Sequence, residues 1–218
     1  MVSIRESILY PWKTDSLPKH IVFGVLFILL SPLVIPAFCF AGYYARMLKC
    51  ASMSENPPGF NNWVDMLFEG VYTVFIILAY TIVPISVFAL VLSVTPLPPA
   101  SLLVSIIFFY VYVSPVPVIL YMRRGSVVAA FDISTITDVI FTRDYFIAVL
   151  ISIVLSLVML LGLGSIAFVL LQLPDALTFV LFPLFFCYAF FWLYIVWASL
   201  CGKAANPVLG DRRFQVGE

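Results

Sequence analysis

The chain has 218 residues, of which 64% are apolar and only 10% charged, and its formal net charge is zero. Ordinary soluble domains carry roughly 45–50% apolar and about 25% charged residues. The mean hydropathy of +1.15 is too high for a soluble fold of this size, and a neutral chain offers no basic surface for nucleic acid. The composition therefore indicates an integral membrane protein whose partners include membrane lipids and no nucleic acid.

Five long apolar stretches produce this composition, and all 11 basic and 11 acidic side chains lie outside them. About 20 uncharged apolar residues are enough to cross a bilayer as a helix. We therefore expect an all-α polytopic transmembrane helix bundle of about five spans. It should form a single domain over residues 1–205, including a leader at 1–19, followed by a polar tail at 206–218. The predicted spans are residues 21–44, 71–92, 101–121, 145–171 and 176–200.

The leader places apolar side chains at helical spacing, namely Ile4, Ile8, Leu9 and Trp12. This pattern is typical of a short amphipathic helix that lies in the headgroup layer. Tryptophan is enriched at that depth because its ring is apolar and its N–H is polar. We therefore expect Trp12 to anchor the leader at the membrane surface.

The first apolar stretch is too long for a simple span. Residues 21–44 would form about 36 Å of helix, against a hydrocarbon core of about 30 Å. Pro32 and Pro36 lie near its middle, where each removes a backbone hydrogen bond. Either it is one tilted and kinked span, which we take as the working expectation, or it is a re-entrant hairpin. Prolines that predict broken helices recur in the later stretches at Pro84, Pro115, Pro117 and Pro183.

Loop charges predict the topology. Lysine and arginine occur in the long connections 45–70 and 122–144 and in the C-terminal tail, but the short connections 93–100 and 172–175 have none. The positive-inside rule then places the long loops and the C-terminus in the cytoplasm of a multi-pass cell-membrane protein. A single first span would put the basic residues of the leader outside, whereas a re-entrant hairpin would keep every basic residue inside.

Two stretches share a pattern, which suggests a parallel repeat of two spans. Each has a span, Tyr-x-Arg, a loop, Asp followed by two apolar residues and Phe, and a Tyr four positions later; the two copies begin at Tyr44 and Tyr121. Duplicated helical hairpins of one orientation occur in membrane proteins. Tyr and Arg are also favoured at any membrane boundary, as belt and snorkelling residues. The predicted interface anchors are Trp12, Tyr44, Arg46, Trp63, Tyr121 and Arg123.

Both long loops carry signals for a helix start. Asn61 or Asn62 can cap a helix whose first turn holds Asp65, where the helix dipole favours an acid. In the second loop, Asp132 or Ser134 can cap a further short helix. We expect short amphipathic interfacial helices in the loops, the first of them continuing into the second span.

Four short segments carry a resemblance to a known family. They are Tyr10–Pro11, Gly42–Arg46 (GYYAR), Pro58–Trp63 (PGFNNW) and Leu67–Gly70 (LFEG). With these segments the chain resembles an uncharacterised, mostly archaeal family of polytopic membrane proteins, domain-of-unknown-function family 4013. The resemblance covers nearly the whole chain. It implies a multi-span α-helical protein and implies no particular activity.

The residues predict no catalytic, cofactor or metal site. The single histidine, His20, lies at the edge of the first stretch, and no P-loop, HExxH, GxGxxG or Cys/His cluster occurs. The cysteines Cys39, Cys50, Cys187 and Cys201 form no CxxC pair, and we expect reduced thiols.

We therefore expect no enzyme, but a protein that acts by association, as an accessory or scaffold subunit or a homo-oligomer. Gly162 and Gly164 would supply small surfaces for helix packing. One alternative is a channel or transporter for a neutral or lipophilic solute, for which the broken helices would supply the pathway. A second alternative is a bilayer-shaping or lipid-surface protein.

Overall fold

The computed structural model describes residues 4–13, 17–94, 104, 106, 108–170, 172 and 175–211. Every regular element in these residues is helical, which confirms the predicted all-α class. In chain order the elements are α1 (Ile4–Ile8), the 3-10 turn η1 (Tyr10–Lys13), α2 (Leu17–Leu29), α3 (Val34–Ser52), α4 (Trp63–Val94), the π-helical turn η2 (Phe109–Val113), α6 (Pro115–Arg124), the 3-10 turn η3 (Val127–Phe131), α7 (Ile133–Ile140), α8 (Arg143–Leu170) and α9 (Asp175–Asp211).

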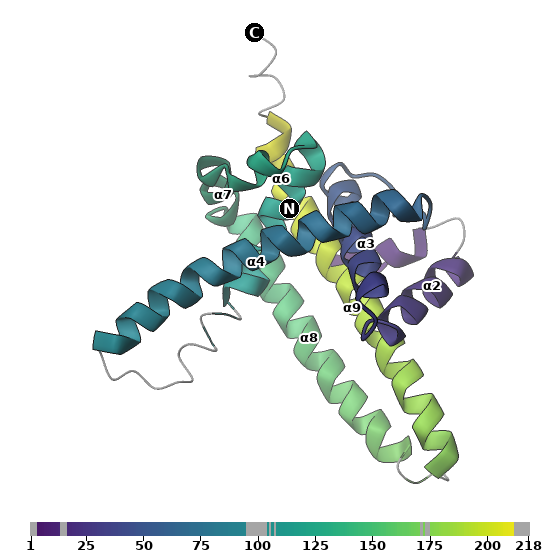
Figure 1. Ribbon diagram of the computed structural model, residues 1–218. Coiled ribbons are helices and arrows are strands. Elements are labelled where there is room, and N and C mark those ends of the chain that lie inside the picture. Colours follow the sequence, from purple (N-terminus) through teal and green to yellow (C-terminus); the bar gives the residue numbers. More distant parts are fainter. Residues whose placement is uncertain are drawn as a thin grey trace.

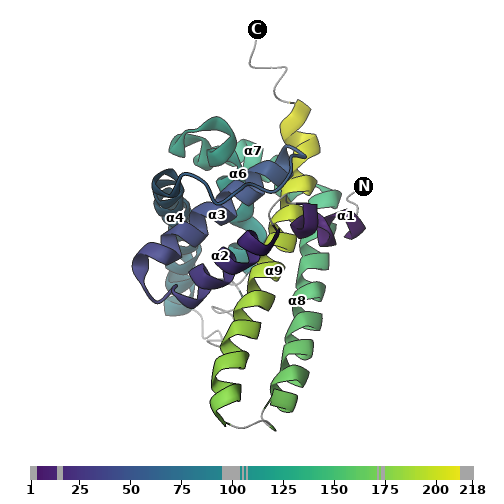
Figure 2. The ribbon, with the colours of Figure 1, turned by 90° about the vertical axis from the view of Figure 1, so that its right-hand side faces the viewer.

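Long apolar helices support the expected membrane association of the chain. The described residues contain three helical segments long and apolar enough to cross one, in α4, α8 and α9. They overlap the predicted spans 71–92, 145–171 and 176–200. Helices α8 and α9 form an antiparallel pair that extends away from the rest of the chain, whereas α4 packs on α3 and runs in a different direction from this pair (Figures 1 and 2).

The first apolar stretch folds as a hairpin of two helices, which differs from the single span taken as the working expectation. Phe27 of α2 and Tyr43 of α3 both contact the ring of Phe60, with centroids 5.7 and 4.0 Å apart. A continuous helix would hold Phe27 and Tyr43 about 24 Å apart. The chain therefore doubles back between Leu29 and Val34, in the shape of the re-entrant alternative (Figure 2).

Proline explains where this hairpin turns. Pro32 disfavours the helical conformation of Ser31 before it and cannot donate a backbone hydrogen bond. Helix α2 accordingly ends at Leu29, and the turn is closed by the bond from Leu33 N to Leu30 O at 2.8 Å. Pro36 lies in the first turn of α3, where backbone N–H groups have no helical partner and a missing one is harmless.

Two glycines set the closest crossing in the structure, between α3 and α4. A Cβ atom added to Gly42 would lie 1.9 Å from the carbonyl oxygen of Met66, and one added to Gly70 would lie 1.8 Å from that of Phe38. Only hydrogen fits at either position, so the two backbones touch. Gly202 has the same role where α9 crosses α3, because its added Cβ would lie 2.9 Å from Leu48 O.

The third predicted span, residues 101–121, falls partly outside the described residues, and its described part is broken. The π-helical turn η2 closes with a bond from Ser114 N to Phe109 O at 3.1 Å, just before Pro115. The hydroxyl of Tyr145 in α8 donates to Tyr112 O at 2.8 Å, so a neighbouring helix supplies a donor at the break. All residues of α6 from Pro115 to Met122 are buried, and α6 is a central core helix.

The predicted loop helices are present. Helix α4 begins directly after Asn62 and runs without a break from the loop into the apolar stretch, as expected. Helix α7 begins after Asp132, which is its N-cap. The leader forms α1 and η1 rather than one helix, with Tyr10 and Pro11 buried and Trp12 exposed.

Candidate functional site at the polar end of the helix bundle

Segments distant in sequence meet at one end of the bundle, which we call the polar end. The hydroxyl of Tyr10 in the leader donates to the carbonyl oxygen of Glu55 after α3 at 3.0 Å. Lys203 of α9 places its Nζ 3.8 Å from a carboxylate oxygen of Glu6 and 5.5 Å from the centre of the Tyr10 ring. Burial raises the pKa of Tyr10 well above its ordinary value, so this phenol remains a donor at all physiological pH values.

A polar cleft of about 440 Å³ lies at this end. Acids and lysines share its wall, so it can pair with groups of either charge. No cluster of three or more metal-binding side chains occurs among the described residues. The charged side chains that line the cleft are Glu6, Lys13, Glu55, Asp144 and Lys203.

Arg46, a predicted membrane anchor, links two helices. Its guanidinium forms an ion pair with Glu69 of α4 and donates to Asn61 O at 2.7 Å. The side chains of Arg46 and Glu69 are only 16% and 28% exposed. The pair therefore links α3, the following loop and α4 directly beside the Gly42–Gly70 crossing.

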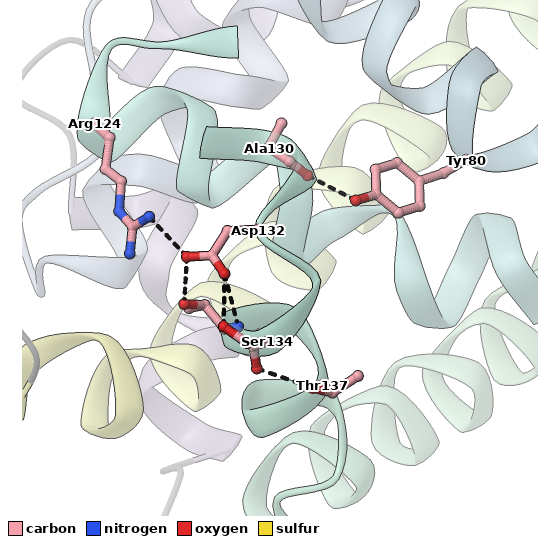
Figure 3. Close-up of polar contacts among 7 residues, drawn as sticks. Tyr80, Arg124, Ala130, Asp132, Ser134 and Thr137 are labelled. Carbon is pink, nitrogen blue, oxygen red and sulfur yellow. Dashed lines mark hydrogen bonds and ion pairs between the residues drawn. The ribbon is translucent and has the colours of Figure 1, made fainter. Parts of the chain in front are cut away.

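Asp132 organises the loop between α6 and α7, as Figure 3 shows. Its carboxylate accepts hydrogen bonds from the Thr135 backbone N–H at 3.2 Å, the Ser134 hydroxyl at 2.8 Å and Arg124 at 2.9 Å. The hydroxyl of Thr135, also a donor to this group, and these other donors hold the pKa of Asp132 well below its usual range. Nearby, the hydroxyl of Tyr80 in α4 donates to Ala130 O at 2.7 Å (Figure 3).

The two copies of the predicted repeat have different surroundings. Tyr72 is 46% exposed, whereas its equivalent Tyr145 is completely buried and bonded to η2. Tyr44 and Tyr121 are both buried, but Tyr44 contacts Tyr194 and Trp197 of α9 while Tyr121 contacts Tyr72 of α4. Similar local sequence therefore supports dissimilar packing.

The remaining predicted residues divide between surface and interior. Trp12 and Trp63 are 53% and 43% exposed, and their role as membrane anchors stays a prediction. Arg123 is half-buried in the last turn of the core helix α6. At Gly162 and Gly164 an added Cβ would find no atom within 4 Å outside its own stretch of α8, so neither glycine packs closely against another described helix. Their role in helix packing stays a prediction.

Sequence reasoning missed the residues that hold the polar end together. Gly42 and Gly70 lie in two of the segments that carry the family resemblance, but the sequence alone assigns them no packing role, and it does not bring Glu6 and Lys203 together. A glycine spaced within an apolar run was the available signal for a close crossing. The four cysteines are free thiols, and Cys39, Cys187 and Cys201 are buried.

Comparison with known proteins adds a family and no activity. No curated protein and no solved structure matches the chain. The family described as proteins of unknown function, DUF4013, matches residues 25–168, which is well over half of the chain. This stretch includes the end of α2, the turn into α3, the Gly42–Gly70 crossing, the Arg46–Glu69 pair and the Asp132 cap. The chain therefore belongs to the DUF4013 family.

Proposed function

We propose that this protein acts by association within the membrane, as a homo-oligomer whose copies meet along α4, without turning over a substrate. The observation that carries the proposal is the state of α4. In its most apolar 18-residue window only 6% of the residues are buried within the chain. A helix that is apolar all round belongs in a membrane or inside a larger assembly.

One face of α4 has the spacing of a helix-packing seam. The exposed apolar residues advance by four and three positions in turn over the first five turns, which is the heptad spacing of helices that interdigitate. Met66, Thr73 and Ile76, on the opposite face, are buried against the rest of the chain. The seam is thus directed away from the chain's own core. It consists of Val64, Phe68, Val71, Phe75, Leu78 and Ile82.

A second copy of the same chain fits this seam because the seam is uncharged and self-complementary. A two-fold axis would bring the same face of each α4 together, as in most homodimers. Membrane helices associate by van der Waals packing of complementary surfaces, and large side chains at heptad positions provide such a surface without a specific polar partner.

Cysteine crosslinking tests this seam. In a background with the four native cysteines replaced by alanine, we place single cysteines along α4 and oxidise native-membrane vesicles. Crosslinked dimers are expected for at least one of Phe75→Cys and Leu78→Cys, which are 57% and 51% exposed before substitution. Ile76→Cys, at a completely buried position of the same helix, is the matched control and should not crosslink. Dimers at none of these positions, or equally at all, would contradict the seam.

A second variant, at Gly162, tests whether α8 also contributes to the assembly. Gly162→Leu meets open space within the chain, so folding and membrane insertion should be unaffected. If α8 also contributes to the assembly through its small residues, this variant should shift the purified protein toward smaller oligomers in light scattering. An unchanged oligomer mass would limit the interface to α4, and a strictly monomeric wild type would refute association altogether.

We further infer that the polar end faces the cytoplasm. Helices α8 and α9 are antiparallel, so Arg143 at the start of α8 and Asp175 at the start of α9 lie at opposite ends of the pair (Figure 1). The hairpin of α2 and α3 also returns the leader to the end that holds Lys203, which favours one side for nearly all basic residues. The topology prediction also places Thr95 of the short connection 93–100 opposite Arg213 of the tail, but both residues lie outside the described part of the chain.

Labelling from each side of the membrane tests the orientation. Single cysteines at positions 124 and 175, in the cysteine-free background, are treated with a membrane-impermeant maleimide in intact cells and in inverted vesicles. We expect position 175 to react in intact cells and position 124 to react only in inverted vesicles. Labelling of both positions from the same side would overturn the assignment.

A further inference from the structure

An apolar cavity of about 580 Å³ lies on the side of the α8–α9 pair. One wall is an aromatic ladder on α9. Phe186 stacks on Phe190 at 6.1 Å, Phe190 contacts Tyr194 at 4.8 Å, and Tyr194 contacts Trp197 at 5.5 Å. From Phe186 to Trp197 the wall is about 17 Å long at the rise of an α-helix. We call this cavity the lateral groove.

The opposite wall, on α8, begins with the small residues Ser152 and Ser156. The hydroxyl of Ser152 donates to Ala148 O at 2.8 Å, and that of Ser156 donates to Ser152 O at 2.7 Å. Both hydroxyls are bonded within their own helix, so these residues offer the groove little hydrogen-bonding capacity. Leu157, Leu160 and Leu163 continue the wall away from the polar end. The groove is therefore apolar along most of its length.

Polar groups gather only at the end of the groove nearest the polar end of the bundle. There the hydroxyls of Tyr110 and Tyr194 lie 3.1 Å apart, and either can be the donor. Two phenols carry two O–H groups and this bond uses one of them. The pair thus retains one donor that can reach an acceptor in the groove.

We propose that the lateral groove binds the hydrocarbon chain of one membrane lipid, with an acceptor oxygen of the lipid at the Tyr110–Tyr194 pair. The groove has the arrangement of an amphiphile, apolar along its length and with a hydrogen-bond donor at one end. Its volume falls within the range of roughly 300–1,000 Å³ that is usual for small-molecule sites.

The lining and the position of the groove favour a lipid chain as its occupant. The described residues that line it include no charged side chain. The groove lies between two helices long and apolar enough to cross a membrane, so its open side faces the hydrocarbon of the bilayer. This site is separate from the α4 seam and does not rest on the proposed association.

A matched pair of serines on α8 tests the proposal. Ser156 lines the groove and Ser165 does not, yet the hydroxyl of each donates to the carbonyl four residues earlier, at 2.7 and 3.0 Å. Ser156→Phe fills the groove, whereas Ser165→Phe adds the same ring to an exposed face of the same helix. Both variants are made in full-length protein in which Trp12, Trp63 and Trp192 are replaced by phenylalanine, leaving Trp197 as the only tryptophan.

The probe is phosphatidylcholine brominated on one acyl chain, titrated into detergent-purified protein, because bromine quenches tryptophan fluorescence at contact. We expect saturable quenching of Trp197 with about one lipid per chain, unchanged in Ser165→Phe and at least tenfold weaker in Ser156→Phe. Removal of both hydroxyls, by Tyr110→Phe together with Tyr194→Phe, should weaken binding about fivefold, the equivalent of one hydrogen bond of about 1 kcal/mol.

Native mass spectrometry of the same samples should show the bound lipid in the wild type and in Ser165→Phe, and its loss in Ser156→Phe. Circular dichroism establishes that each variant is folded; if Ser156→Phe is not, Leu160→Trp in the mass measurement replaces it, because Leu160 is 64% exposed and tolerates a larger ring. Quenching that is linear and unsaturable, or equal in both serine variants, overturns the proposal.

Discussion

Gly70→Ala is expected to destabilise the protein by about 3 kcal/mol or more. The new Cβ would lie 1.8 Å from the backbone oxygen of Phe38 and 2.9 Å from the nitrogen of Gly42, whereas ordinary carbon contacts are about 3.5–4.0 Å. Backbone atoms cannot rotate aside as a side chain would, so α3 and α4 must separate along their whole contact. Overpacking of this kind exceeds the usual range of about 1–3 kcal/mol.

Gly164→Ala is the matched control, because it makes the same change within an apolar helix where no atom lies within 4 Å. Alanine favours a helix by up to about 1 kcal/mol relative to glycine, so this variant should be slightly more stable than the wild type. Thermal unfolding in detergent, followed by circular dichroism, measures both. Equal melting temperatures for the two variants would show that α3 and α4 do not cross at these glycines.

Arg46→Met is expected to lower the free energy of unfolding by about 2 kcal/mol. The substitution keeps most of the side-chain length but leaves the carboxylate of Glu69, only 28% exposed, without its cation. A charge that is left unpaired in a partly buried site loses hydration with no compensation. The backbone oxygen of Asn61 also loses a donor at 2.7 Å, which should loosen the loop that leads into α4.

A double-mutant cycle separates the ion pair from the packing of the arginine stem. Arg46→Met combined with Glu69→Met should recover part of the loss, because no unpaired charge remains. Arg124→Met is the matched exposed control, since Arg124 is 43% exposed in its pair with Asp132, and a pair of that kind contributes about 0–1 kcal/mol. If Arg46→Met and Arg124→Met have equal effects on the melting temperature, the Arg46–Glu69 pair is no more than a surface contact.

The sequence by itself determined the features that depend on a few neighbouring residues. Uncharged apolar runs predicted the helices α8 and α9 because a backbone in hydrocarbon must satisfy its own hydrogen bonds. Pro32 predicted a break that the structure places between α2 and α3, and Asp132 was one of two predicted caps for α7. Each of these signals acts over one or two turns of helix, so it can be read without knowing the fold.

Tertiary structure alone decided how those pieces are arranged. A proline predicts a break but not its direction, and the stack of Tyr43 on Phe60 shows that the chain doubles back. The sequence pattern of Tyr44 and Tyr121 is that of residues at a membrane boundary. Both are buried within the chain, because burial depends on which distant helices pack over them. The lateral groove is likewise formed by side chains more than 80 positions apart, such as Tyr110 and Tyr194. Apolar composition is nearly uniform along these helices, so it cannot encode which face meets which.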